Sequence, residues 1–307
     1  MRSQSRFPAT IADVVRAGLL AGAILAATGS LAAARDDSFL NRVDFSPKHA
    51  KAWELPRRLT EISGLAAAPD GRVFTHEDED GIIYEIDPTG GRIVKAFALG
   101  DTTAKGDFEG IAVANGKIYL TTSDGVIYEA PEGDNGARVL YNTYETGIGR
   151  HCEVEGLAYD AAAGDLLIPC KTIRDYAFED DFVLYRWSLA SREAPKTPAL
   201  VVPLDTLFAD KGGSKSFRPS GIEIVPDTGN YLIVASLNHL IVEMTPAGTL
   251  ISEVELDHGD HPQAEGITIL PGPVLLISDE GRKKHDGRLA LYRLKGAQIS
   301  RTEPGNR

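Results

Sequence analysis

Short runs of apolar residues, separated by turn residues, recur along most of this chain. In one stretch, Leu65–Ala68 and Arg72–Thr75 flank a Pro-Asp-Gly turn, and Ile82–Ile86 and Ile93–Leu99 follow. Short strands at even spacing, bounded by Gly, Pro, Asn and Asp, are typical of all-β proteins. No long amphipathic helical pattern competes with them. The pattern therefore predicts an all-β fold.

A three-residue motif marks a repeat: Ser or Glu, then Gly, then Leu or Ile. The copies are Ser63-Gly64-Leu65, Glu109-Gly110-Ile111, Glu155-Gly156-Leu157, Ser220-Gly221-Ile222 and Glu265-Gly266-Ile267. Successive copies begin 46, 46, 65 and 45 residues apart, and the long interval holds insertions at 172–181 and 192–219. Units of this length with four strands each are typical of β-propeller blades.

The last repeat closes the predicted ring. The second unit reads as strands at 111–114, 118–121, 126–129 and 138–141, whereas the fifth unit lacks a fourth strand. The segment Ala50–Leu55 stands unassigned before the first unit. If it completes the last blade, two open sheet edges disappear. We predict a β-propeller of five four-stranded blades over 49–296, with six blades as the alternative if the long interval hides a degenerate one.

The N-terminal segment predicts export. Arg2, Arg6 and Arg16 precede or open an apolar run at 17–31, and small residues follow up to Ala34. This is the pattern of a signal peptide cleaved after Ala34. The alternative is an uncleaved short anchor, in which case alone we expect membrane contact. We predict a signal peptide at 1–34, a linker at 35–48, a flexible tail at 297–307, and a periplasmic or secreted protein.

Charge narrows the choice of partners. The chain has a formal net charge of −12. Such a surface repels phosphate backbones, so we expect no nucleic acid partner. The expected partner is a small molecule or a component of the cell envelope.

The repeat also predicts where polar residues gather. The first strand of a blade lines the central channel, and its start lies at the same end as the end of the second strand. Side chains at these positions should converge on one mouth of the channel. The candidate residues are Ser63, His76, Glu109, Asp124, Glu155, Lys171, Ser220, Asn238, Glu265 and Asp279.

Three of these candidates are glutamates, and they can be interpreted in two ways. Glu109, Glu155 and Glu265 repel one another unless a cation, a basic side chain or a proton intervenes. Oxygen ligands of this kind suit calcium. Alternatively, each glutamate accepts backbone N–H bonds and ties neighbouring blades together, which is a role that would repeat from blade to blade.

The sequence does not decide whether the protein is an enzyme. The nucleophile and phosphate-loop motifs Gly-x-Ser-x-Gly, Gly-x-x-x-x-Gly-Lys, His-Glu-x-x-His and Gly-x-Gly-x-x-Gly are absent from the sequence. Catalytic residues are therefore unknown. A metal-dependent hydrolase needs none of these motifs, and in that case Asp279 or His76 would act as base.

Cys152 and Cys170 are the two cysteines of the chain. In an oxidising compartment they are a candidate disulfide. If Asp160 faces Asp165 across the hairpin, Cys152 lies opposite Ile173, three positions from Cys170. That offset is about 10 Å along a regular strand, and a disulfide requires Cα atoms within about 7 Å. We predict a disulfide, made by a bend that folds Cys152 back; free buried thiols are the alternative.

The ordered motif set resembles the SdiA-regulated (YjiK-like) β-propeller family over residues 50–295. The resemblance rests on the motif copies given above, with Cys152 before the third and Cys170-Lys171 after its second strand. It implies a five-bladed propeller held outside the cytoplasm, without an established activity. Similar propellers carry calcium at the channel mouth and hydrolyse phosphate or lactone esters. Ser63 and Ser220 replace Glu here, which puts phytase chemistry in doubt.

We therefore expect a propeller that binds a small or extended ligand at one mouth, with calcium as a candidate ion. The alternatives are a metal-dependent hydrolase of phosphoesters or lactones and a protein-interaction scaffold.

Overall fold

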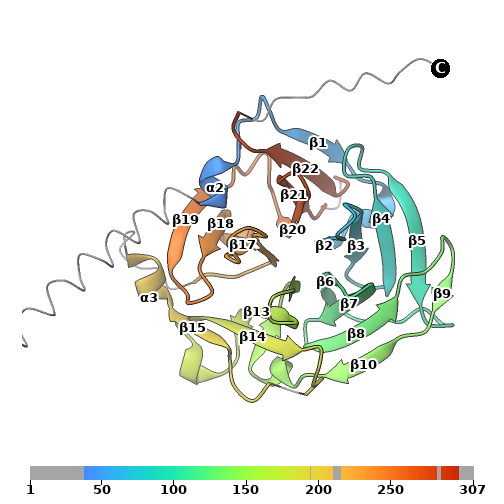
Figure 1. Ribbon diagram of the computed structural model, residues 1–307, viewed down its shortest axis with the longest axis horizontal. Helices are drawn as coiled ribbons and strands as arrows, with labels where there is room; N and C mark the ends of the chain where they lie inside the picture. Colours follow the sequence, from blue (N-terminus) through green and yellow to red (C-terminus); the bar gives the residue numbers. More distant parts are fainter. Residues whose placement is uncertain (1–37, 194, 210–215, 282–284, 297–307) are drawn as a thin grey trace, which may run out of the picture.

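A computed structural model of the chain contains five β-sheets, which are arranged around a central axis as the blades of a propeller (Figure 1). The structure describes residues 38–193, 195–209, 216–281 and 285–296. The predicted signal peptide at 1–34 and the predicted tail at 297–307 lie outside these residues. The prediction of an all-β propeller with five blades is confirmed. The long interval between the third and fourth motifs contains insertions within one blade and no sixth sheet among the described residues.

In each blade the strands follow one another in order from the central axis to the rim. Blade 1 contains β2 (Ile62–Ala67), β3 (Val73–Glu77), β4 (Ile82–Ile86) and β5 (Ile93–Leu99), and blade 2 contains β6 (Phe108–Ala114), β7 (Lys117–Thr122), β8 (Val126–Pro131) and β10 (Asn142–Glu145). Blade 3 contains β11 (Cys152–Val154) and β12 (Ala158–Asp160), which both pair with β13 (Asp165–Ile173), followed by β14 (Asp181–Ser188) and β15 (Leu200–Pro203). Blade 4 contains β16 (Gly221–Ile224), β17 (Tyr231–Ala235), β18 (Leu240–Met244) and β19 (Leu250–Glu255).

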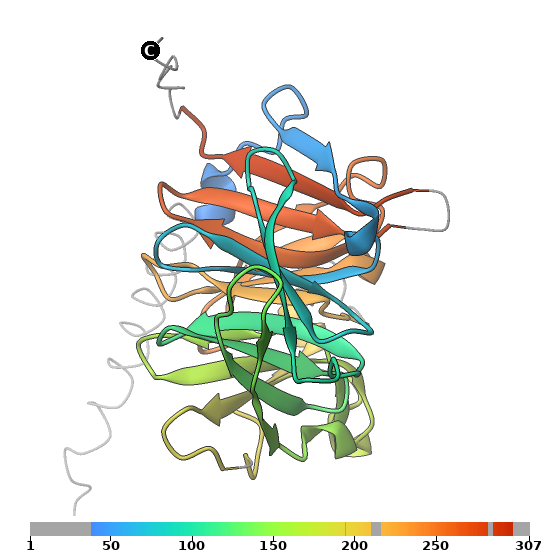
Figure 2. The same ribbon diagram turned by 90° about the vertical axis from the view of Figure 1, so that its right-hand side faces the viewer.

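Blade 5 joins the two ends of the domain. It contains β20 (Ala264–Leu270), β21 (Val274–Asp279) and β22 (Arg288–Arg293), and β1 (Lys51–Glu54) is its fourth strand. β1 runs antiparallel to β22, with Trp53 opposite Leu289, and Figure 2 shows the two strands side by side. This confirms the prediction that an N-terminal strand completes the last blade.

The fourth strand of blade 2 differs from the prediction. We expected it at 138–141, but β10 begins at Asn142. The short strand β9 (Arg138–Val139) instead pairs in parallel with β5 at the outer edge of blade 1 (Figure 1). Arg138 holds it there by donating a hydrogen bond from Nη1 to the Gly100 carbonyl oxygen at 3.0 Å. Strand propensity identifies an extended segment, but not which of two sheet edges it will pair with.

Residues 38–43, which the sequence analysis assigned to a linker, pack against blades 4 and 5. The short helix α2 (Phe39–Arg42) buries Phe39 and Leu40, each 1% exposed. Ser38 Oγ and the Leu40 backbone N–H both donate to Glu243 Oε2, at 2.7 and 3.0 Å. This segment therefore contributes to the hydrophobic core between blades 4 and 5.

The remaining helical segments are short and lie in connections. They are α3 (Leu204–Leu207), η1 (Arg57–Leu59), η2 (Ile148–Arg150), η3 (Tyr176–Phe178) and η5 (Ser236–Asn238). The apolar core consists of five clusters, each between two neighbouring blades. Blade-to-blade packing, rather than one central core, stabilises the ring.

The motif glycines explain the repeat physically. A Cβ atom added to Gly110 would lie 2.5 Å from the backbone carbon of Gly156 in the next blade, and one added to Gly221 would lie 2.5 Å from the Glu265 carbonyl oxygen. Such contacts are shorter than van der Waals separation. Each inner strand therefore approaches the next one at a glycine, and the Gly156 N–H donates to the Glu109 carbonyl oxygen at 2.7 Å.

Candidate functional site

The central channel is narrow where the motifs meet. Its walls are the motif glycines of all five blades, the leucine or isoleucine that follows each glycine, Ser63 and Glu265. The cavity has a volume of about 10 Å³, which is room for about one water molecule or ion. A small organic molecule does not fit inside it. A ligand on this side of the ring would bind at the mouth and send only one atom-sized group inward.

Lys171 lies among the three motif glutamates. Its Nζ atom donates to Glu155 Oε1 at 2.6 Å, and its charge also interacts with those of Glu265 and Glu109. Burial lowers the pKa of Lys171, but the three carboxylates outweigh burial and the net effect is a raised pKa. The ammonium is therefore charged at neutral pH. It is the basic side chain that three converging carboxylates require.

One ammonium does not neutralise three carboxylates. Burial, followed by the charge of Glu155, raises the pKa of Glu109 to about 9. Burial also raises the pKa of Glu155 to about 8, against the opposing effect of Lys171, and that of Glu265 to about 8. These raised pKa values mean that the three carboxyl groups do not all ionise together near neutral pH, although Glu155 pairs with the Lys171 ammonium. The positive charge of Lys171 is not enough to balance three ionised carboxyl groups at the mouth.

Two carboxylate oxygens also lack hydrogen-bond donors. Glu155 and Glu265 are 2% and 7% exposed, and the Oε2 atom of each is buried without a partner in the described part of the chain. Glu109 is better served, because Ser63 Oγ donates to its Oε2 at 3.0 Å. Buried polar atoms without partners are rare and call for an explanation.

Ser220, rather than a glutamate, ties two blades together through the backbone. Its Oγ donates to the Ala264 carbonyl oxygen of blade 5 at 2.7 Å and accepts the Ser236 N–H at 3.1 Å. Among the described residues, the carboxylates of Glu109, Glu155 and Glu265 accept no such backbone bond. Inter-blade contact is made by the motif glycines, by Ser220 and by the Ser63–Glu109 hydrogen bond, which leaves Glu155 and Glu265 for another role.

The other predicted site residues bond to groups other than the three glutamates, and His76 packs against the motif glycine Gly64. Asp124 is exposed and pairs with Arg174 at 3.4 Å. Asn238 holds a loop, since its Oδ1 accepts the Arg218 N–H at 2.9 Å. His76 is fully buried and its Nδ1 contacts the Glu77 carbonyl oxygen; burial lowers its pKa to about 4.

Asp279 belongs to a buried hydrogen-bond network in blade 5. Its Oδ2 lies 2.8 Å from His261 Nδ1, and His261 Nε2 lies 2.6 Å from the Tyr292 hydroxyl. All three side chains are buried, and Asp279 is 0% exposed. This network joins the loop before β20 to β21 and β22.

A separate acidic group lies on blade 1. Glu61, Glu77 and Asp78 form the one set of three acidic or histidine side chains, among the described residues, whose ligand oxygens lie within 4.8 Å of one another. Glu109, Glu155 and Glu265 do not form such a set. None of the three is among the candidates from sequence, although the position of Glu61, two residues before the motif copy that begins at Ser63, could have indicated it.

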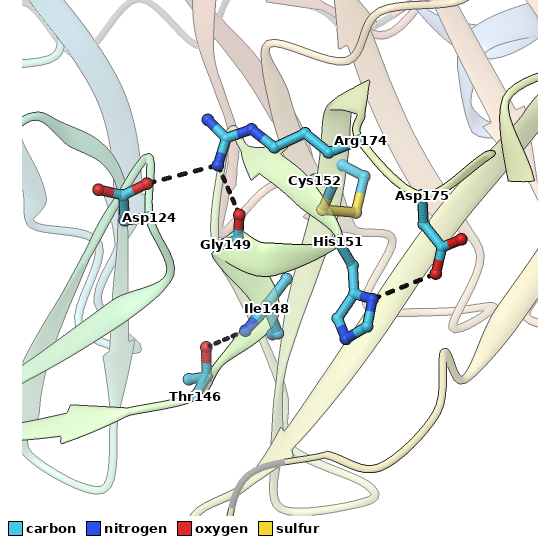
Figure 3. The surroundings of a disulfide bond; sticks show 9 residues. Asp124, Thr146, Ile148, Gly149, His151, Cys152, Arg174 and Asp175 are labelled. Carbon is cyan, nitrogen blue, oxygen red and sulfur yellow. Dashed lines mark hydrogen bonds and ion pairs between the residues drawn. A yellow bond between two sulfur atoms is a disulfide. The ribbon is translucent and has the colours of Figure 1, made fainter.

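The disulfide between Cys152 and Cys170 is present, as predicted (Figure 3). Cys152 lies opposite Ile173, also as predicted, but it is paired as the first residue of β11 instead of being folded back by a bend. The pairing shifts between Glu153 and Val154, so that Val154 lies opposite Cys170. This irregularity brings the two Cα atoms to 5.6 Å, within the range that a disulfide requires.

The same irregularity positions Lys171. Thr172 pairs with Glu153 and Cys170 pairs with Val154, which leaves Lys171 between them without a cross-strand partner. Bulged residues are re-aimed relative to a regular strand. The disulfide, with both cysteines buried, holds the strand segment from which the ammonium reaches Glu155.

Comparison with known proteins supports the fold. No protein-family model matches the chain, and no curated protein matches it. Among solved structures, the chain is similar to glutaminyl cyclase from Myxococcus xanthus, with 15% identity, a TM-score of 0.51 and coverage of 80% of this chain and 96% of that one. It is also similar to the PQQ-bound aldose sugar dehydrogenase from Streptomyces coelicolor, with 15% identity, a TM-score of 0.50 and coverage of 81% and 99%.

A luciferin-regenerating enzyme gives a TM-score of 0.51 at 10% identity, with coverage of 80% of this chain and 96% of that one. At such identities the likeness concerns the fold alone. Within the described residues, no helix is both long and apolar enough to cross a membrane.

Proposed function

We propose that this protein is an exported propeller that binds a positively charged ligand at the mouth ringed by Glu109, Glu155 and Glu265. The observation that carries the proposal is the pair of buried Oε2 atoms, on Glu155 and Glu265, that no donor in the described chain satisfies. A ligand that brings positive charge or N–H donors would satisfy both. It would also let the carboxyl groups ionise.

The charge of the mouth matches such a ligand. With Lys171 charged, full ionisation of the three carboxyl groups leaves two excess negative charges. Calcium is one candidate, because the donors are carboxylate and hydroxyl oxygens. Glu109, Glu155 and Glu265 would hold it, and it would supply the missing charge. Their oxygens would first have to draw closer together, since they do not form a compact set.

Two further parts of the proposal rest on other features. The Cys152–Cys170 disulfide supports export, because disulfides persist in oxidising compartments. The ordered motif set supports membership of the SdiA-regulated (YjiK-like) family. Binding is favoured over ester hydrolysis because both candidate bases, His76 and Asp279, are 0% exposed.

The test is thermal unfolding of the purified protein with calcium, with magnesium, with alkylammonium salts and after chelation. Ligands that bind only the folded form raise the melting temperature. We expect a saturable rise that Glu155→Gln and Glu265→Gln abolish.

Glu129→Gln is the matched control, because Glu129 is equally buried but pairs with Lys117 and Arg192 away from the motif. If neither a metal ion nor an amine stabilises the wild type, the proposal is wrong.

A further inference from the structure

We infer that the group entering the mouth is a primary ammonium on an alkyl chain, and that Lys171 occupies the first of two ammonium positions there. The inference rests on the proposed function and names its ligand class. Three observations carry it: how Lys171 is bound, which acceptors remain, and how much room the channel leaves.

Lys171 shows that this cluster binds an ammonium. Its Nζ lies 2.6 Å from Glu155 Oε1, a short charge-assisted hydrogen bond. Glu265 and Glu109 also attract it. The bulge opposite Glu153 directs the side chain to this place, and the adjacent disulfide fixes the bulge. The backbone around the bulge therefore holds the Lys171 ammonium in position against these carboxylates.

The acceptors that remain suit a second ammonium. Glu155 Oε2 and Glu265 Oε2 are buried and accept no hydrogen bond in the described chain, and Glu109 has Ser63 on Oε2. An –NH₃⁺ group carries three donors and no acceptor. One further ammonium could therefore donate to Glu155 and Glu265, whereas the oxygens of all three glutamates lie too far apart for one ammonium to reach.

The size of the channel points to the same group. A cavity of about 10 Å³ holds about one non-hydrogen atom at the scale of a water molecule. Of the three glutamates, Glu265 lines this cavity, so an ammonium head would bind at the Glu265 end with its alkyl chain extending outward through the mouth. A bulky or ring-shaped cation would be excluded.

A metal ion suits the mouth less well. Calcium takes about 6–8 oxygen ligands around one point, whereas the oxygens of Glu109, Glu155 and Glu265 do not form a compact set. One of those glutamates is already bonded to a competing cation. The acidic group with oxygens close enough for a metal lies instead at Glu61, Glu77 and Asp78.

Chemical rescue tests the first ammonium position. Lys171→Ala should lower the melting temperature, and millimolar propylammonium should restore at least half of the loss. Tetramethylammonium has the same charge but no N–H donor and should restore none. Lys117→Ala is the control, because it removes a lysine from another buried glutamate, Glu129, outside the mouth; propylammonium should not rescue it.

Calorimetry on the wild type tests the second position without relying on a destabilised variant. Propylammonium should bind saturably, and Glu265→Gln should weaken it at least tenfold, whereas Glu129→Gln should not change it. Calcium is titrated in parallel, with Glu77→Gln reporting on the blade 1 acidic group.

The outcomes separate the two proposals. If calcium binds through Glu155 and Glu265 while propylammonium neither binds the wild type nor rescues Lys171→Ala, the ammonium inference is overturned and the proposed function stands. If neither probe binds at these glutamates, both are overturned.

Discussion

Replacing Gly110 by alanine tests whether inter-blade contact explains the motif. An added Cβ would lie 2.5 Å from the Gly156 carbonyl carbon and 2.7 Å from the Leu157 nitrogen. Both atoms are backbone, so neither can move aside by changing a rotamer. Blades 2 and 3 would have to separate by roughly 1 Å to reach an ordinary contact distance of about 3.5 Å.

The expected loss follows from overpacking. Forcing a methyl group into a well-packed site costs about 1–3 kcal/mol of stability. We expect Gly110→Ala to lie at the upper end of this range because the neighbouring atoms belong to the backbone. For a domain of this size about 3 kcal/mol corresponds to a fall of roughly 6–12 °C in melting temperature. The assay is thermal unfolding followed by circular dichroism.

Gly116→Ala is the matched control for this prediction. Gly116 lies in the next hairpin turn with φ of 73°, and an added Cβ would meet nothing within 4 Å. Gly116→Ala should lower the free energy of unfolding only by the left-handed backbone strain of about 1–2 kcal/mol. If Gly110→Ala melts no lower than Gly116→Ala, close approach between blades is not the reason for the motif glycine.

Truncation to residue 58 removes β1 together with four side chains that are at most 2% exposed, Phe39, Leu40, Val43 and Leu55. Burial of each such side chain stabilises the fold by about 1.5–3 kcal/mol, so the truncated protein should show no cooperative melting transition. A wild-type melting curve would disprove ring closure. Thiol titration of the denatured, unreduced protein should find no reactive thiol, and the double variant Cys152→Ser, Cys170→Ser should lose about 3 kcal/mol for a loop of this length; two thiols per chain would contradict the disulfide. Because Glu265 has a pKa raised from 4.5 to about 8 in the folded state, the fold retains a proton that the unfolded chain releases, so stability should fall as pH rises from about 4.5 to 8. Glu265→Gln should flatten this dependence in melts between pH 5 and 9 and melt above the wild type at pH 9; an unchanged slope would mean that Glu265 is ionised at neutral pH.

Local pattern in the sequence was sufficient for the architecture. The recurring Ser/Glu-Gly motif, its spacing and the turn residues predicted five blades, and the unpaired segment before the first motif predicted the closing strand. These features are readable because, apart from β1 in blade 5 and β9 on blade 1, each blade is a contiguous stretch of chain whose strands pair with their neighbours in sequence. The pairing of Asp160 with Asp165, and hence of Cys152 with Ile173, could be counted along one hairpin for the same reason.

The details of the candidate site depended on contacts between distant residues. The sequence placed Lys171 and glutamates from three blades at one mouth, but it did not indicate that the Lys171 ammonium would bond to Glu155, because a bulge shifts the register at Cys170. It did not indicate that residues 38–43 dock on Glu243, some 200 positions away, or that β9 crosses to blade 1. In each of these cases one segment could contact either of two partners. Alternation and spacing describe the segment itself, and only the packed fold decides which partner lies within reach.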